Sequence, residues 1–252
     1  MVGTLLVRGM LVGIVAGLLS FGFLKVYGEP EVDRAIAFEA QLDEAKAAAE
    51  RAKGMNMSDE EKPELVSRQV QAGIGLFTGV MVYCTAFGGL FGLAFAFAYR
   101  RVPGALTPQG VSALLAATGF VAIYLVPNLK YPANPPSVGD PETIGIRTAL
   151  YFIMIAISIA AMVGAVSFKR LFVPRFREWN AILIVAACYI VLVALAGLLL
   201  PVVNEVPDQF PAVVLWKFRI ASLGGQFIMW TTLGLLFGAL TQRALTTRTQ
   251  HA

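Results

Sequence analysis

Residues 148–168 read Thr-Ala-Leu-Tyr-Phe-Ile-Met-Ile-Ala-Ile-Ser-Ile-Ala-Ala-Met-Val-Gly-Ala-Val-Ser-Phe, without one charged side chain. A helix of about 20 apolar residues is long enough to cross about 30 Å of hydrocarbon. The chain as a whole is 57% hydrophobic and only 14% charged. Soluble domains carry about a quarter charged residues. The sequence therefore predicts an integral membrane protein.

Apolar runs of the same kind recur along the whole chain. Four more runs contain no Asp, Glu, Lys or Arg, namely 72–98, 102–129, 181–203 and 220–242. A sixth run, 5–24, contains only Arg8, whose long side chain can reach the membrane interface. We therefore expect an all-α bundle of six transmembrane helices, with residues 1–252 as a single polytopic membrane domain.

The first apolar run has an alternative reading as a secretory signal, with Arg8 in the basic region that precedes the apolar core. However, Lys25-Val-Tyr-Gly-Glu-Pro stands where a small-residue cleavage site is required. Gly9, Gly13 and Gly17 also recur every fourth residue, which creates a flat face for a neighbouring helix. We expect the run to be a retained helix. Similar glycine pairs in the second and sixth runs are compatible with packing inside the bundle or against a partner subunit.

Basic residues predict the orientation in the membrane, because cytoplasmic loops are rich in Lys and Arg. They follow the second, fourth and sixth runs, at Arg100, Arg101, Lys169, Arg170, Arg175, Arg177, Arg243 and Arg248. Both termini are then cytoplasmic. The segments 26–70, 128–147 and 204–219 face outward.

The first outward segment differs in composition from the rest of the chain. Residues 29–66 begin with Glu-Pro-Glu and continue through an Ala/Glu/Lys-rich stretch to Gly54. Proline at the start and glycine past the end are typical of helix boundaries. We expect an extramembrane arm of a solvated, acidic helix followed by a loop.

The second outward segment is dense in proline and charge. Residues 127–147 read Pro-Asn-Leu-Lys-Tyr-Pro-Ala-Asn-Pro-Pro-Ser-Val-Gly-Asp-Pro-Glu-Thr-Ile-Gly-Ile-Arg. Prolines fix φ and remove amide donors, so this backbone is expected to hold a defined non-helical shape. Each outward segment combines proline, acids and an arginine before the next helix. We therefore hypothesise three related helical hairpins.

The outward segments carry the candidate site. Carboxylates with waters and carbonyls suit divalent cations, and we predict that the metal ion or its hydration shell contacts Glu29, Asp33, Asp140, Glu142 and Glu205. The side chains expected to support this set are Arg34, Arg68, Lys130, Asn134, Arg147, Asn204 and Arg219. Arg34, Arg147 and Arg219 are expected to hold the carboxylates. The alternative is that these groups only pair with one another and cap helices.

Several chemistries are not supported by the residues present. The single histidine, His251, is in the C-terminal tail, and the two cysteines, Cys84 and Cys188, lie within apolar runs. An imidazole or thiolate cage for a transition metal cannot be assembled from them. There is no phosphate-binding Gly-x-x-x-x-Gly-Lys-Ser/Thr motif and no nucleophile–histidine set. We expect neither an enzyme nor a tightly bound cofactor, and no nucleic-acid partner.

Four motifs together resemble those of the CbtA family of cobalt transporter subunits. They are Gly28-Glu-Pro with Asp33-Arg34-Ala-Ile, Ser67-Arg68-x-x-Gln71, the long segment from Tyr124 through Asn134 to Gly145, and Asn204-Glu-Val-Pro-x-x-Phe-Pro with Leu215-Trp-Lys-Phe-Arg219. The resemblance covers nearly the whole chain. It implies a membrane component of a cobalt uptake system associated with cobalamin metabolism, located in a bacterial inner membrane.

The resemblance also implies Co²⁺ as the transported ion and a small one-helix partner with a histidine-rich tail. The leading hypothesis is a subunit that admits Co²⁺, or a related divalent ion, through an outward mouth lined with carboxylates. One alternative is a non-transporting scaffold or assembly subunit, and another is a permease component for a corrinoid-like organic substrate. Besides the lipid bilayer, a homo-oligomer is a further possible partnership.

Overall fold

The computed structural model describes residues 2–52, 66–99, 101, 106–136, 138–140, 142–172 and 177–250. Within that part all the regular secondary structure is helical, and there is no strand. Six of its helical segments are long and apolar enough to cross a membrane, which confirms the expected number. The segments are α1 (Val2–Tyr27), α3–η1–α4 (Arg68–Tyr99), α5–η2–α6 (Pro108–Lys130), α7 (Ile144–Phe172), α8 (Glu178–Leu199) and α9–η3–α10 (Ala212–Gln250).

Three of these segments contain a π-helical stretch. These are η1 (Gln71–Gly75), η2 (Phe120–Leu125) and η3 (Leu233–Phe237). They divide the helices around them into α3 (Arg68–Val70) and α4 (Leu76–Tyr99), α5 (Pro108–Gly119) and α6 (Val126–Lys130), and α9 (Ala212–Thr232) and α10 (Gly238–Gln250). The π-helix is rare, and where it occurs it is frequently found at functional sites.

Proline and threonine set several helix ends. Thr107 caps α5, because its hydroxyl accepts a hydrogen bond from the Gly110 amide at 3.1 Å, and Pro108 occupies the first helical turn. The helix α8 ends at Leu199, four residues before the predicted end of its apolar run at 203. Pro201 explains the difference, since it cannot continue a helix and favours an extended residue before it.

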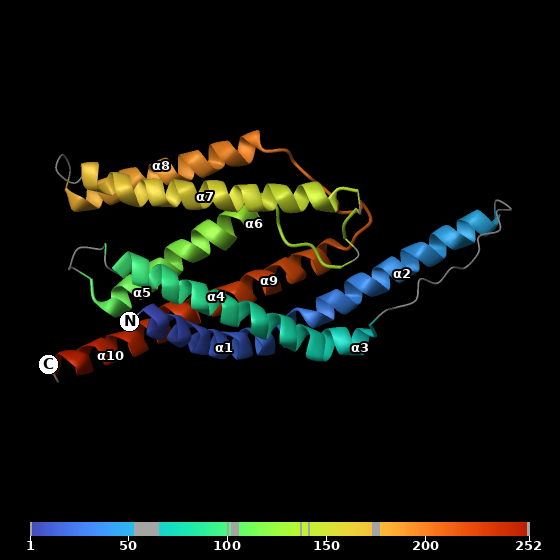
Figure 1. Cartoon of the computed structure of the whole chain (residues 1–252). Helices are drawn as coiled ribbons and strands as arrows, with labels where there is room; N and C mark the ends of the chain where they lie inside the picture. The colour runs from blue at the N-terminus through green and yellow to red at the C-terminus, as the bar shows by residue number, and fades with distance from the viewer. Residues whose placement is uncertain are drawn as a thin grey trace.

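The helices form two groups of unequal size (Figure 1). In the larger group α1 lies against α4 and α9, and α5 packs on η3 and α10. The smaller group is the antiparallel pair α7 and α8, which joins the first group through contacts of α7 with η2 and α6. The three hairpins expected from the sequence are therefore not all formed. The third would pair α8 with α9, but α8 packs on α7 and α9 packs on α1.

The contact between α1 and α4 depends on glycine. A Cβ atom added at Gly9 would lie 2.1 Å from the Gly88 carbonyl oxygen, and one at Gly13 would lie 2.3 Å from that of Cys84. The two backbones approach as closely as the absence of side chains allows. The glycine face predicted on the first helix thus serves packing inside the bundle. A Cβ atom added at Gly79, by contrast, would have no atom of a neighbouring helix within 4 Å.

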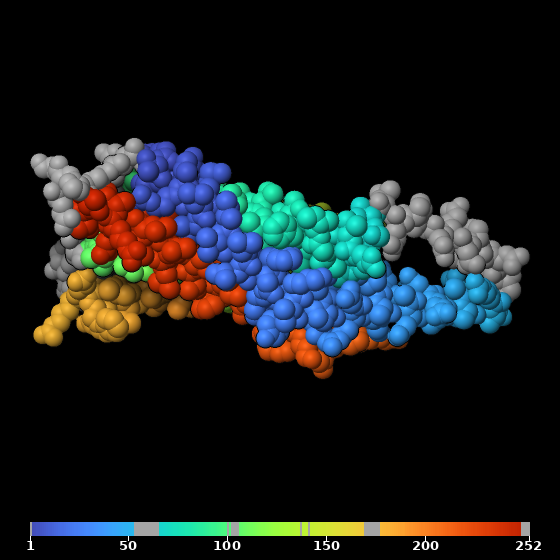
Figure 2. Space-filling view, turned by 90° about the horizontal axis from the view of Figure 1, so that it is seen from below, coloured from blue at the N-terminus to red at the C-terminus, as the bar shows by residue number. Residues whose placement is uncertain are grey.

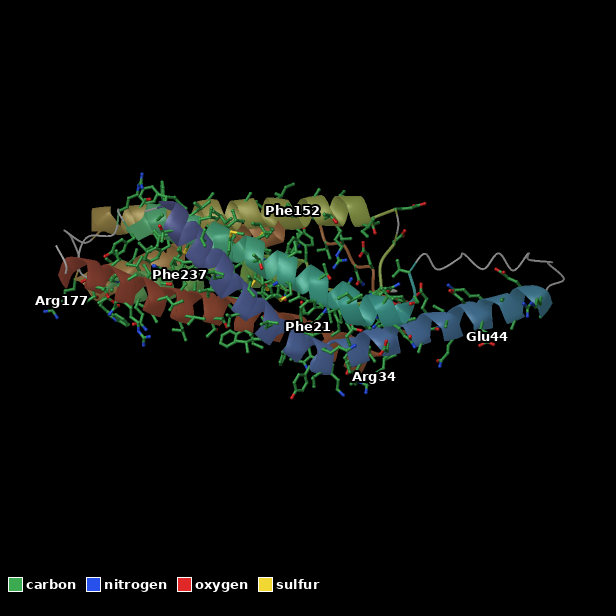
Figure 3. The ribbon with its side chains drawn as sticks, turned by 60° about the horizontal axis from the view of Figure 1, so that its bottom comes forward. Phe21, Arg34, Glu44, Phe152, Arg177 and Phe237 are labelled. Atoms are coloured by element: carbon green, nitrogen blue, oxygen red, sulfur yellow. The ribbon has the colours of Figure 1, made fainter. Side chains whose placement is uncertain are left out.

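Aromatic side chains fill the interior of the larger group. Phe95 and Phe237 are fully buried, with ring centroids 5.1 Å apart in an edge-to-face arrangement, and Phe91 packs against Phe237 at 5.4 Å. Phe237 lies among the helices, whereas Phe152 stands on the outer side of α7 (Figure 3). Phe152 and most of α8 expose apolar side chains. This surface is suited to lipid, and the fold is that of a multi-pass membrane protein.

The helix α2 (Glu29–Ala52) projects beyond the bundle as a single rod (Figures 1 and 2). Only its base is anchored, because Ala35 is buried in a cluster with Val138 and Phe210, and Phe38 packs against that cluster. The rest of the helix is largely exposed. Residues 53–65 of the predicted arm lie outside the described part of the chain.

Candidate functional site

The base of α2 is tied to the start of the second membrane-spanning segment by an arginine. The Arg68 guanidinium donates to the carboxylates of Glu29 and Asp33, with 2.9 Å between Arg68 Nη2 and Asp33 Oδ1. Glu29 is buried and Asp33 is exposed. One turn of helix separates the two acids, so one planar guanidinium can bind both. The structure thus places two of the predicted metal-contacting acids on Arg68, which was expected only as a supporting residue.

Arg34 has a different partner, Glu31, which the sequence analysis did not select. Its guanidinium donates to Glu31 Oε1, and the Glu31 side chain is only 6% exposed whereas that of Arg34 is 54% exposed. The second oxygen, Oε2, is buried without a hydrogen-bond partner among the described residues. The sequence contained a signal for this burial, because Glu31, Ala35 and Phe38 share one face of α2.

A second ion pair joins the first turn of α7 to the loop before α9. Arg147 Nη1 donates to Glu205 Oε2 at 3.0 Å, and the Thr143 hydroxyl donates to Glu205 Oε1 at 2.7 Å. The Glu205 side chain is only 2% exposed. Both carboxylate oxygens therefore have a partner, which a buried charge requires. The predicted link between Arg147 and a carboxylate is present in the structure.

The proline-rich loop is held by two arginines from different helices. Arg147 Nη2 donates to the Pro132 carbonyl at 2.6 Å, while Arg219 donates to the Ala133 carbonyl at 3.2 Å and to Asn134 Oδ1 at 3.0 Å. Arg219 thus binds a backbone carbonyl and an amide, not the carboxylate predicted for it. Proline has no backbone N–H, so few amides in this loop can bind its own carbonyl oxygens. The arginine guanidinium has five N–H donors and can bind several of these oxygens at once.

Tyr131 anchors the other end of the same loop. Its hydroxyl donates to the Pro201 carbonyl at 2.8 Å, and its ring is buried against Leu150 and Met154 of α7. Burial raises the pKa of Tyr131 above its ordinary value, because the charged phenolate is poorly solvated there. The ammonium group of Lys130 lies 5.8 Å from the centre of this ring. Lys130 therefore contacts an aromatic face.

The remaining predicted residues lie on the surface. Asp140 and Glu142 are exposed, and Asp140 Oδ1 accepts a hydrogen bond from the Glu142 amide at 2.9 Å in the turn that begins α7. Asn204 Oδ1 accepts from the Val206 amide at 3.3 Å in the turn after α8. These side chains shape local turns. The carboxylate of Glu142 is free to face water.

The predicted carboxylates are therefore at one end of the bundle but in separate groups. Glu29 and Asp33 share Arg68, Glu205 is enclosed by Arg147 and Thr143, and Asp140 and Glu142 lie outside both clusters. Within the described ranges, no three His, Cys, Asp or Glu side chains come together in a way that could hold a metal ion. Contact between these acids and an ion stays a prediction. We call this end, with the base of α2 and loops 131–143 and 200–211, the distal end.

The fold and the site define a class: a polytopic helical membrane protein whose charged side chains are concentrated at the helix ends. Residues 2–242 match the family described as "Probable cobalt transporter subunit (CbtA)". The chain belongs to the CbtA family, as the sequence motifs indicated. No curated protein and no solved structure matches it.

Proposed function

We propose that this protein is the membrane subunit of a cobalt uptake system, and that its distal end faces outward and admits Co²⁺ or a related divalent ion. The observation that supports the proposal is the position of the charged groups. Acids from three separate segments gather at the distal end, and the exposed members are Asp33, Asp140 and Glu142. Exposed carboxylates attract a hydrated cation without removing its water.

The buried and the exposed acids have different roles in this proposal. Glu29 and Glu205 are committed to arginines, so they fix the shape of the distal end. The exposed Asp140 and Glu142 contact the hydration shell of the arriving ion. Weak contact is suited to transport, because an ion that binds tightly leaves slowly.

The orientation rests on the basic residues at the opposite end. Arg177 lies there (Figure 3), as do the helix α10, which contains Arg243, and the N and C termini (Figure 1). Arg101 closely follows the end of α4 at Tyr99. Short basic loops stay in the cytoplasm. A transporter subunit works with other chains, and we propose that a small one-helix partner with a histidine-rich tail supplies the imidazole ligands that this chain lacks.

The test is Co²⁺ uptake into vesicles that contain this chain alone, and then this chain with the presumed partner. We expect Asp140→Asn and Glu142→Gln to lower uptake several-fold at unchanged membrane abundance. The matched control is Glu44→Gln, which removes an exposed acid from the projecting part of α2 (Figure 3). Equal uptake in all three variants would show that the distal acids do not guide the ion.

A scaffold function is the alternative, and one observation favours it. The helix α8 touches the rest of the chain mainly along α7, and its apolar side chains are exposed over most of its length. Such a surface offers room for a partner helix as well as for lipid. Absence of Co²⁺ flux with and without the partner, together with stable co-purification of the two chains, would favour the scaffold.

A further inference from the structure

A cavity lies between α1, α4 and α10 at the end of the bundle opposite the distal end, which we call the basic end. The helices α1 and α10 lie side by side on the surface there (Figure 2). The volume of the cavity is about 90 Å³. A single water molecule needs about 10–15 Å³, so the space takes a group several times larger. Most of its lining is apolar, with Leu5, Phe95 and Ala244 among the side chains.

Among the described residues that line the cavity, only Arg8 is charged. Its Nη1 donates to Thr241 Oγ1 of α10 at 3.1 Å. Thr241 is fully buried and Arg8 is half-buried, so this bond holds the guanidinium between α1 and α10. One neutral hydroxyl leaves most of the five N–H donors of a guanidinium available and does not neutralise its charge.

The helices around Arg8 offer it no carboxylate. The chain contains no Asp or Glu in residues 1–28, 65–139 and 209–252, which include the whole of α1, α4 and α10. A charge that is partly removed from water among apolar groups is costly unless a charge of opposite sign pairs with it. The partner that suits Arg8 is therefore an anion from outside these three helices.

The depth of Arg8 in the membrane identifies the source of such an anion. With a rise of about 1.5 Å per residue, Thr241 lies about 33 Å along the helix from Arg219, and Arg8 lies about 26 Å from Lys25. Arg219 is part of the distal end, and the hydrocarbon core of a bilayer is about 30 Å thick. Arg8 and Thr241 thus lie where the hydrocarbon meets the headgroups on the basic side. Lipid phosphates are the anions at that level.

An apolar path leads from the cavity to the lipid-facing surface. Ala96 lines the cavity and also a more open recess beside it, which contains Leu93, Phe97 and Arg101. Leu93 and Phe97 are exposed, and the Arg101 guanidinium lies 3.6 Å from the centre of the Phe97 ring. Acyl chains can pack on these apolar side chains while a phosphate enters the cavity. A free phosphate ion would gain nothing from them.

We infer that the cavity binds an anionic phospholipid, with the headgroup phosphate on Arg8 and the acyl chains along Leu93 and Phe97. A guanidinium binds two phosphate oxygens at once, and the hydroxyl-bearing side chains of Thr4 and Tyr99 are part of the same lining. Basic pockets between membrane helices are typical sites for anionic lipids. The positive group of a zwitterionic lipid would instead lie near two arginines without a carboxylate on α1, α4 or α10. The site goes beyond the proposed function and does not depend on Co²⁺ uptake.

The test measures lipid binding to the purified full-length protein in detergent by native mass spectrometry. The probes are phosphatidylglycerol, phosphatidylcholine and inorganic phosphate. We expect phosphatidylglycerol to bind at least about tenfold more tightly than phosphatidylcholine, a difference of about 1.4 kcal/mol. Arg8→Gln should raise the Kd for phosphatidylglycerol at least about tenfold. Arg8→Lys should raise it less, because lysine keeps the charge but loses the planar pair of donors.

Two further variants separate the site from general attraction between charges. Arg243→Gln removes the same charge from an exposed position on α10 that does not line the cavity, and should change the Kd little because exposed charges are screened by salt. Ala244→Leu fills part of the cavity without changing any charge and should weaken binding. Phosphatidylglycerol should also raise the unfolding temperature of the unsubstituted protein but not that of Arg8→Gln.

Each outcome either supports or overturns the lipid site. Equal binding of the two lipids, a Kd that Arg8→Gln leaves unchanged, or an equal loss of binding in Arg243→Gln would overturn it. Displacement of phosphatidylglycerol by inorganic phosphate would make the cavity a site for a free anion. If Arg8→Gln does not fold, Arg8→Lys and Ala244→Leu decide in its place. Selective loss of binding in the cavity variants would support the site whether or not vesicles take up Co²⁺.

Discussion

Replacing Arg147 by glutamine removes the only cationic partner that the described structure gives Glu205. The Glu205 side chain is 2% exposed and keeps one hydrogen bond, from Thr143, in the variant. Breaking one side of a buried ion pair destabilises a protein by about 3–5 kcal/mol, because the other charge stays buried without compensation. The variant also loses the hydrogen bond from Arg147 to the Pro132 carbonyl. We therefore expect Arg147→Gln to lower the free energy of unfolding by about 3–5 kcal/mol.

The assay is unfolding in mixed micelles, with two comparison variants. Arg147→Gln combined with Glu205→Gln removes both charges and should recover most of the loss. Lys46→Met breaks a pair on α2 whose side chains are 63% and 66% exposed, at 3.6 Å from Asp43, and should cost less than about 1 kcal/mol. If Arg147→Gln costs no more than Lys46→Met, or if the double variant is as unstable as the single one, the reasoning from burial is refuted.

Three further predictions concern packing and hydrogen bonding. Gly13→Leu should separate α1 from α4 and lower the free energy of unfolding by at least about 1–3 kcal/mol. Gly79→Leu should be tolerated, because a Cβ atom at this position has no neighbour within 4 Å. Thermal unfolding and membrane abundance measure the effect of both changes. Tyr131→Phe should cost about 1 kcal/mol by removing the bond to the Pro201 carbonyl, and equal unfolding temperatures would contradict it. Arg68→Gln should release the base of α2 and speed proteolysis of that helix, and unchanged cleavage would argue against Arg68 as its anchor.

The distal end shows where prediction from the sequence succeeded and where it failed. Glu29, Asp33 and Arg68 were all placed at the outer boundary from the sequence, and in the structure they meet there. Arg34 was expected to hold one of the five predicted carboxylates, but in the structure it pairs with Glu31, which was not among them. Glu31 was overlooked because its burial depends on what covers that face of α2, here the cluster of Ala35, Val138 and Phe210.

The sequence by itself determined the number of membrane spans, their approximate ends and the family. These follow from the length of uncharged runs and from local motifs, and both are written in residues near one another in the chain. Tertiary structure alone decided that α8 pairs with α7, that Arg219 holds a loop carbonyl, and that Glu205 is enclosed by Arg147 and Thr143. The physical reason is that hydrophobicity places a helix in the membrane but does not determine which helices pack against it. That packing depends on close contacts at glycines and on hydrogen bonds to buried polar groups, and both involve residues far apart in the chain.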